Sequence, residues 1–167
     1  MSLFFARKSF ALAVVFCLST GLLFTGCNTE PEPEDTSFVP LGEWADDYGS
    51  GYNITASSLE YYTADTEWDG ITYPGENIKG GIKEAVDFSS NAGVLLVQIT
   101  TSTAEGQEGK FIGIYYKDYT ASHVFLANAV DETYALIVKD TLTEAKNTFT
   151  VDNVETHVTY WGTGYTK

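Results

Sequence analysis

Arginine and cysteine are nearly absent from this 167-residue chain. The single arginine is Arg7, and both cysteines, Cys17 and Cys27, lie within the first 27 residues. The rest of the chain therefore has no guanidinium for bidentate phosphate contacts, which argues against a nucleic-acid partner. It also has no pair of thiols for a disulfide, so its stability must come from an apolar core.

Basic residues of any kind are scarce beyond the N-terminus. Residues 27–167 contain seven lysines against 23 acids, which gives a net charge of −16 with histidine neutral. Such an excess is compatible with solubility, with a cationic partner or with divalent cations. The same stretch contains all eleven tyrosines and all three tryptophans, so rings are plentiful for packing or binding.

The first 26 residues have the pattern of an export signal. Arg7 and Lys8 lie in a short segment without acids, and an apolar run from Phe10 to Phe24 follows. The run has the length of a signal h-region, whereas a spanning helix needs about 20 apolar residues. We expect residues 1–26 to be a signal peptide. The alternatives are an N-terminal anchor helix and an ordinary secretory signal that is cut nearby.

The segment Leu23-Phe24-Thr25-Gly26-Cys27 resembles the lipobox of bacterial lipoproteins, in the looser form found in spirochaetes. The usual Leu three residues before the cysteine is here Phe24. The resemblance implies that Cys27 becomes the N-terminus and carries acyl chains such as palmitate. Two or more chains anchor a protein firmly in a bilayer. Asn28, in place of the inner-membrane retention aspartate, favours the outer membrane or the cell surface.

Composition divides the remainder into a tether and a domain. Residues 27–40 are rich in proline and acids, which predicts a disordered, extended tether. From residue 41 to 167, β-branched and aromatic runs alternate with turn signals about every ten residues, which predicts an antiparallel barrel or sandwich. The expected strands are 52–55, 59–62, 78–88, 93–100, 111–116, 123–127, 134–138 and 156–161; for 134–138 the start of a helix is the alternative.

One segment has helical rather than strand periodicity. Thr141 and Glu144 have the spacing of a capping box, and Leu142, Ala145 and Phe149 share one helical face. This predicts a short helix over residues 142–149. The expected fold is therefore an all-β antiparallel barrel of about eight strands with one short helix near the C-terminus. A β-sandwich is the alternative.

Gly42-Glu43-Trp44, at the start of the domain, resembles the Gly-x-Trp motif of lipocalins and the wider calycin group. In those families the tryptophan closes one end of a ligand-binding barrel. They commonly stack an arginine on it, and here a lysine would have to substitute. The start at Gly42 and the later Tyr160-Trp161-Gly162 also resemble small spirochaetal lipoproteins. Without the resemblance, Trp44 is an ordinary core aromatic.

Two candidate binding sites follow from the residue pattern. Adjacent aromatic residues in strands point to opposite faces, so some rings face inwards. The residues expected near a ligand cavity are Trp44, Trp68, Tyr115 and Trp161; the alternative is that these rings only fill the core. Asp65, Glu67, Asp69 and Glu76 have spacing close to a Ca²⁺-binding loop, although flanking helices are not expected. The alternative is a simple acidic hairpin loop, and no other cofactor is expected.

No catalytic motif is present in the sequence. The Gly-x-Ser-x-Gly elbow is missing, and His123 and His157 lie in separate expected strands, too few for a zinc site. We predict a membrane-anchored, non-catalytic binding domain for a small apolar or aromatic ligand or a protein partner. The alternatives are a cation-dependent surface adhesin or structural lipoprotein, and a small hydrolase.

Overall fold

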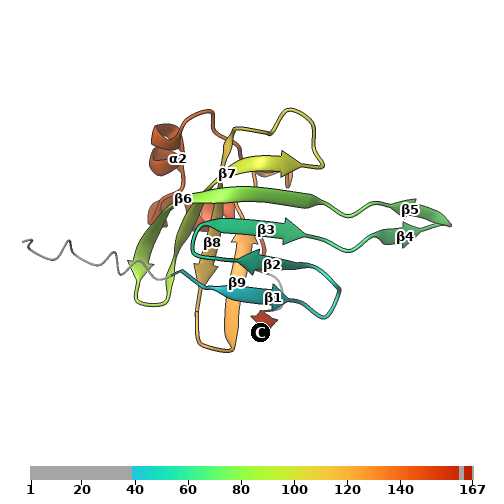
Figure 1. Cartoon of the computed structure of the whole chain (residues 1–167), viewed down its shortest axis with the longest axis horizontal. Helices are drawn as coiled ribbons and strands as arrows, with labels where there is room; N and C mark the ends of the chain where they lie inside the picture. The colour runs from blue at the N-terminus through green and yellow to red at the C-terminus, as the bar shows by residue number, and fades with distance from the viewer. Residues whose placement is uncertain (1–38, 162–163, 167) are drawn as a thin grey trace, which may run out of the picture. The chain divides into compact units, whose positions relative to one another are not determined.

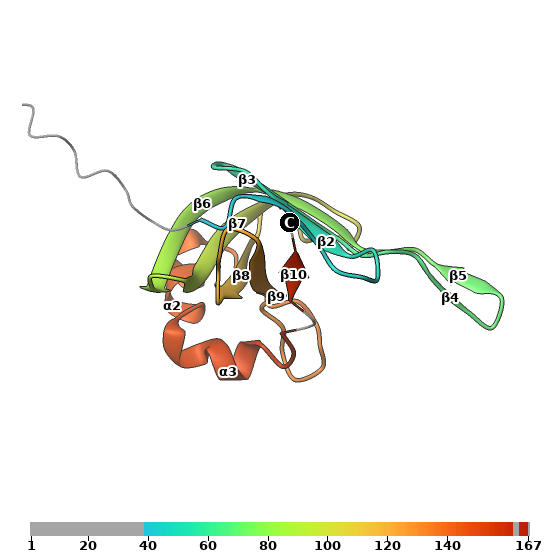
Figure 2. The ribbon, with the colours of Figure 1, turned by 90° about the horizontal axis from the view of Figure 1, so that it is seen from below.

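The computed structural model describes residues 39–161 and 164–166, and eight of its strands close into an antiparallel barrel (Figures 1 and 2). The order around the barrel is β1-β10-β9-β8-β7-β6-β3-β2. The expected barrel is thus confirmed and the sandwich is not. The barrel strands are β1 (Gly42–Ala45), β2 (Gly51–Ile54), β3 (Ser58–Tyr62), β6 (Asn77–Ser89), β7 (Ala92–Ser102), β8 (Phe111–Lys117), β9 (His123–Asn128) and β10 (Tyr165–Thr166).

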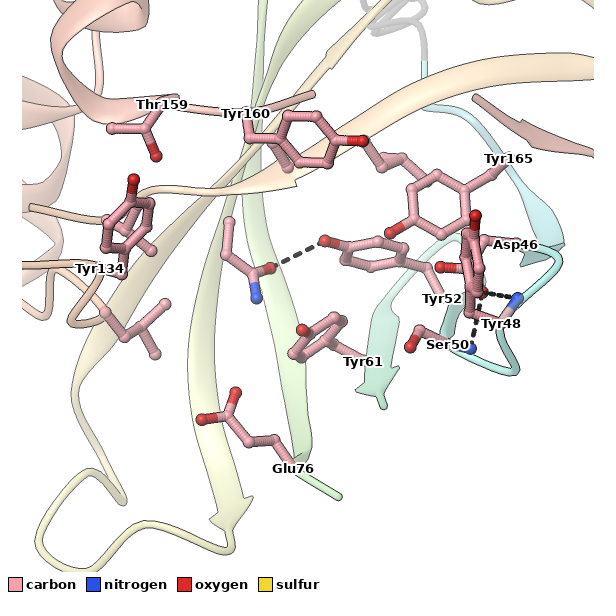
Figure 3. A pocket seen from close by; sticks show the side chains of 15 residues that line it. Asp46, Tyr48, Ser50, Tyr52, Tyr61, Glu76, Tyr134, Thr159, Tyr160 and Tyr165 are labelled. Atoms are coloured by element: carbon pink, nitrogen blue, oxygen red, sulfur yellow. Dashed lines mark hydrogen bonds between the residues drawn. The ribbon is translucent and has the colours of Figure 1, made fainter. Parts of the chain in front are cut away.

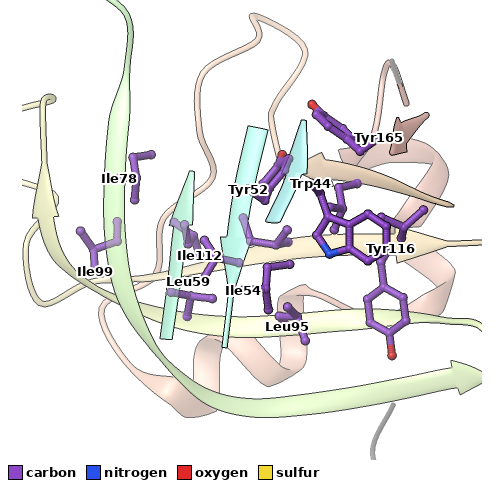
Figure 4. Close-up of a cluster of buried hydrophobic side chains, with 14 residues drawn as sticks. Trp44, Tyr52, Ile54, Leu59, Ile78, Leu95, Ile99, Ile112, Tyr116 and Tyr165 are labelled. Carbon is purple, nitrogen blue, oxygen red and sulfur yellow. The ribbon is translucent and has the colours of Figure 1, made fainter. Parts of the chain in front are cut away.

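Alternating side chains divide the long strands between two cores. On β7, Leu95, Val97 and Ile99 face the barrel interior, while Val94 and Leu96 belong to a second core on the outside. Both faces of β7 are covered, which explains why its sequence is apolar almost throughout rather than alternating. Figure 4 shows the interior core, which large side chains fill.

The outer core lies beneath the C-terminal helices. These are α2 (Leu142–Thr148), the single 3₁₀ turn η1 (Val151–Asn153) and α3 (Val154–His157), and Figure 2 shows α2 and α3 on one side of the barrel. The predicted capping box is present: the Thr141 hydroxyl accepts from the Glu144 amide, and the Glu144 carboxylate accepts from the Thr141 amide. The helix predicted over 142–149 is therefore confirmed, but α3 was not expected.

Two of the predicted strands are wrong. Residues 134–138 make only an isolated bridge, between Val130 and Leu136, since Tyr134 has a left-handed φ of 65°. Residues 156–161 begin inside α3, and the last strand is β10 instead. Only Val158 of that segment is buried, against the outer core, so its β-branched and aromatic residues do not form a strand with two covered faces.

Trp44 lies in the interior core and is fully buried. Its indole N–H donates to the Pro40 carbonyl at 2.8 Å, and its ring packs edge-on against Tyr119, with 5.9 Å between ring centroids. Tyr119 belongs to the loop between β8 and β9. The tryptophan thus packs toward the end of the barrel where β1 begins, which we call the entry mouth.

The opposite end of the barrel is the far mouth, where β1 ends. Because neighbouring strands are antiparallel, the starts of β2 and β6 and the ends of β3 and β9 lie there too. A two-stranded hairpin, β4 (Thr66–Trp68) and β5 (Ile71–Tyr73), projects from this end between β3 and β6 (Figure 1). We call it the arm. Asp69 and Gly70 form its tip, with both residues at positive φ, as a two-residue type I′ hairpin turn requires.

Candidate functional site

A pocket of about 390 Å³ opens at the far mouth (Figure 3). Its walls come from the loop between β1 and β2, the strands β2 and β3, the end of β9 and the segments that flank α2 and α3. Tyrosine is the commonest residue in the lining. The six tyrosines are Tyr48, Tyr52, Tyr61, Tyr134, Tyr160 and Tyr165.

Three of these tyrosines form the pocket floor. The Tyr52 ring lies 5.0 Å from that of Tyr61 and 5.2 Å from that of Tyr165, the latter in an edge-to-face arrangement. The Tyr52 hydroxyl donates to Asn128 Oδ1 at 3.0 Å. Tyr52 and Tyr165 also belong to the interior core, and both are buried. The floor is therefore held by the same packing that holds the barrel together.

The other three tyrosines stand around the rim. Tyr48, Tyr134 and Tyr160 are 75%, 73% and 72% exposed, so their rings are available to a ligand. The backbone at Tyr134 is fixed by Asp131, whose Oδ1 accepts from the amides of Thr133 and Ala135. The left-handed Tyr134 is thus the product of a hydrogen-bonded turn rather than of packing.

Two carboxylates line the pocket, and no basic side chain within residues 39–161 and 164–166 does. Asp46 Oδ1 accepts from the amides of Tyr48 and Ser50 at 2.9 and 2.8 Å, which folds the loop between β1 and β2 over the mouth. Glu76 enters from the other side, just before β6, and is exposed. Figure 3 shows the two on different sides of the tyrosine cluster.

The floor phenols have raised pKa values. Burial raises the pKa of Tyr52 well above 10.0, and the neighbouring phenols Tyr165 and Tyr61 add to the effect. Burial also raises the pKa of Tyr61, with the Glu76 charge as the next cause. Burial and the Asp46 charge raise the pKa of Tyr165 to about 12. The phenols are therefore neutral near pH 7, and the field that they experience is negative.

The four aromatic residues predicted to surround a cavity lie in four different surroundings. Trp44 is in the interior core, and Trp68 is 76% exposed on the arm. Tyr115 lies in the outer core with its hydroxyl 3.2 Å from His157 Nδ1, and Lys117 Nζ lies 4.3 Å from the Trp161 ring centroid. None of the four is among the residues that line the far-mouth pocket.

Three of the four carboxylates of the predicted calcium loop are spread along the arm, and the fourth lies beyond it. Asp65 lies at its base, where Oδ1 accepts from the Gly75 amide at 2.8 Å, Glu67 lies within β4 and Asp69 in the tip. Glu76 lines the pocket instead. An antiparallel hairpin extends these residues in a row, whereas a calcium loop wraps them around an ion. Among the residues described, no group of three or more His, Cys, Asp or Glu side chains is placed to hold a metal.

Part of the pocket carried a signal that the sequence reasoning missed. Tyr52 and Ile54 alternate on β2, and Leu59 and Tyr61 alternate on β3, so both tyrosines share a face with aliphatic residues. Period-two alternation therefore marks them as inward-facing. That they meet Tyr165 and Asp46 depends on strand pairing and barrel closure, which no local pattern reveals.

Comparisons with models of protein families, with curated proteins and with solved structures returned no match. Cys27 and the expected signal peptide lie outside the described residues. In the part of the chain that is described, no helix is long and apolar enough to cross a bilayer.

Proposed function

We propose that this chain is a membrane-anchored lipoprotein whose barrel binds a small ligand in the far-mouth pocket and performs no chemistry on it. The observation that carries the proposal is the pocket itself, with six tyrosines gathered from separate segments around about 390 Å³. Ligand sites commonly occupy about 300–1,000 Å³ and are lined by aromatic side chains with a few polar groups.

The packing of the barrel supports a shallow site rather than a deep cup. Below the floor tyrosines the interior is filled by buried side chains such as Ile54, Leu95 and Ile112 (Figure 4). A ligand would therefore rest on Tyr52, Tyr61 and Tyr165 and contact the rim tyrosines from the side. Because core packing already orders the floor, little conformational entropy is lost there on binding.

The proposed anchor is compatible with access to this site. The lipobox-like sequence before Cys27 supports lipidation, and Asn28 supports placement at the outer membrane or cell surface. β1 begins at the entry mouth, opposite the pocket. Within the described residues, the chain thus enters the barrel at the end where Trp44 packs and not at the pocket.

Binding of a protein partner is a second candidate function, and the arm is the observation that favours it. Trp68, Ile71 and Tyr73 are 76%, 56% and 48% exposed, and they project from the same mouth as the rim tyrosines. Tyrosine and tryptophan are enriched in protein interfaces. The pocket remains the stronger candidate because rings from separate segments converge on one volume of about 390 Å³.

Both parts of the proposal can be tested on protein purified from native membranes. Mass spectrometry of the intact chain should show Cys27 as the N-terminus with the added mass of its acyl chains. A chain that keeps Met1 or begins elsewhere would contradict the anchor.

The ligand is tested on the same material by native mass spectrometry. A small molecule should co-purify with the wild-type protein and be depleted in Tyr160→Ala, which removes an exposed rim ring without disturbing the core. Tyr73→Ala on the arm is the matched control, since Tyr73 does not line the pocket. Equal retention of the molecule by both variants would contradict a site at the far mouth.

A further inference from the structure

The charge of the far-mouth pocket is one-sided. Asp46 and Glu76 line it, and no lysine, arginine or histidine of the described residues does. An anionic ligand would bring a negative charge toward two carboxylates with no cation beside it. The pocket therefore disfavours ligands that carry a carboxylate or a phosphate. Its electrostatic field favours a ligand with a positive charge.

The carboxylates retain capacity to bind. Asp46 uses Oδ1 for the amides of Tyr48 and Ser50, and within the described residues Oδ2 makes no hydrogen bond. The Glu76 carboxylate likewise makes no hydrogen bond or ion pair within that part of the chain. Elsewhere on the barrel acids do pair with lysines, as Glu60 does with Lys79 at 2.9 Å. The two pocket acids have no such partner among the described residues, as is true of most acids on this barrel.

The tyrosine rings supply a second attraction for the same charge. A ring face carries partial negative charge, and several rings around one volume form the arrangement that recognises alkylated ammonium ions. Tyr52 is 2% exposed and Tyr165 9%, so the floor excludes water from the side of a bound cation that rests on it. The cation–π attraction is stronger in such a desolvated site than at an open surface.

A bare metal ion does not fit these groups as well as an organic cation. Metals such as Ca²⁺ take six to eight oxygen ligands, and no cluster of three or more ligating side chains exists in the described residues. A neutral apolar ligand would gain no attraction from the two carboxylates that line the pocket.

We infer that the far-mouth pocket binds a small organic ammonium ion, held by the faces of its tyrosine rings and by the carboxylates of Asp46 and Glu76. This inference rests on the proposed binding function and names the chemical class of its ligand. The alkyl groups would contact the rings, and the charge would lie between the two acids.

The test compares two probes of the same shape and different charge by calorimetry on the full-length purified protein. Choline carries a trimethylammonium group, and 3,3-dimethylbutan-1-ol replaces its nitrogen with carbon. Choline should bind at least about tenfold more tightly than the neutral probe. Equal affinities would overturn the ammonium inference while leaving the binding function in place.

Charge variants test the two carboxylates. Asp46→Asn with Glu76→Gln should weaken choline binding by about tenfold or more, and Asn retains the Oδ1 acceptor that folds the loop. Glu43→Gln with Asp118→Asn is the matched control, because it removes the same charge from exposed positions outside the pocket. Equal losses in the two double variants would show that only net charge matters and would overturn the assigned site.

The ammonium class and the binding function fail in different ways. If choline, tetramethylammonium and benzyltrimethylammonium all give no binding at millimolar concentration, the ammonium inference is overturned. The ligand that co-purifies with wild type and is lost from Tyr160→Ala would still establish the pocket, since that experiment assumes no ligand charge. If no ammonium probe binds and no molecule co-purifies with the wild-type protein, the ammonium inference and the binding function are both overturned.

Discussion

The ring of Phe149 lies directly over Gly113, at a spot where an added Cβ would come within 2.6 Å of the ring carbon Cγ. Gly113 is a buried residue of β8, and Phe149 follows α2 and is itself buried. The missing side chain lets the ring rest on the strand backbone. This contact is one of those that join the C-terminal helical segment to the barrel wall in the outer core.

Gly113→Ala should therefore destabilise the protein. The methyl group must displace a ring that the outer core confines, and overpacking of this kind costs about 1–3 kcal/mol. Urea unfolding followed by circular dichroism measures the change. Gly81→Ala is the control, because its added Cβ meets nothing closer than 3.6 Å and that neighbour is a flexible Lys83 side chain. Similar stability of the two variants would contradict the packing of Phe149.

Alkaline pH should unfold the barrel through its tyrosines. Burial raises the pKa of Tyr115 to about 12, and burial with the Asp46 charge raises that of Tyr165 to about 12, from 10.0. A group that holds its proton more tightly when folded stabilises fully below its unfolded pKa. Stability should thus be constant up to about pH 9 and fall between pH 10 and 12.

Absorbance at 295 nm and urea midpoints follow this titration. Tyr165→Phe should flatten the decline, because it removes one phenol that must ionise as the chain unfolds. A midpoint unchanged from pH 9 to 12 would be incompatible with buried phenols.

His157 should make the protein sensitive to mild acid. Its ring contacts the Tyr115 hydroxyl in the outer core, and burial lowers its pKa below 6.5, with the Lys139 charge adding to the effect. The folded state favours the neutral ring, so its contribution is complete above pH 6.5 and is lost as the pH falls below that value. Urea midpoints at pH 7.5 and 5.0 should differ more for wild type than for His157→Gln. Identical pH profiles would show that His157 does not carry this sensitivity.

Calcium should leave the melting temperature unchanged. A ligand that binds only the folded state must stabilise it, and the arm spreads Asp65, Glu67 and Asp69 along a hairpin rather than around an ion. Thermal melts with about 5 mM CaCl₂ or about 5 mM MgCl₂ test this. These concentrations are high enough to fill a weak extracellular calcium site, whose Kd is about millimolar. A rise with calcium that disappears in Asp65→Asn would establish a site after all.

Local patterns predicted most of the barrel because each acts over a few residues. The alternation of β-branched and aromatic runs with turn signals predicted six barrel strands, which are β2, β3, β6, β7, β8 and β9. The Thr141–Glu144 capping box predicted α2. The arm was missed as strands because all six of its strand residues are exposed, so no buried face marks it.

The pocket was harder to predict because it depends on closure. Tyr52 and Tyr165 are more than a hundred residues apart and meet only because β10 completes the ring between β1 and β9. Trp68 and Trp161 were predicted near the cavity because their rings are large. The size of a ring does not reveal which face of a strand, or which end of the barrel, it occupies. The acids Asp46 and Glu76 could be assigned to one mouth only after strand directions were known.

The shortest strand of the barrel, β10, covers the backbone edges of its two longer neighbours, β1 and β9. β10 contributes only Tyr165 and Thr166 between β1 and β9. Without it, the unsatisfied amides and carbonyls of both neighbours would form open edges, which readily recruit a strand from another molecule. The few residues that close the seam therefore guard the protein against self-association.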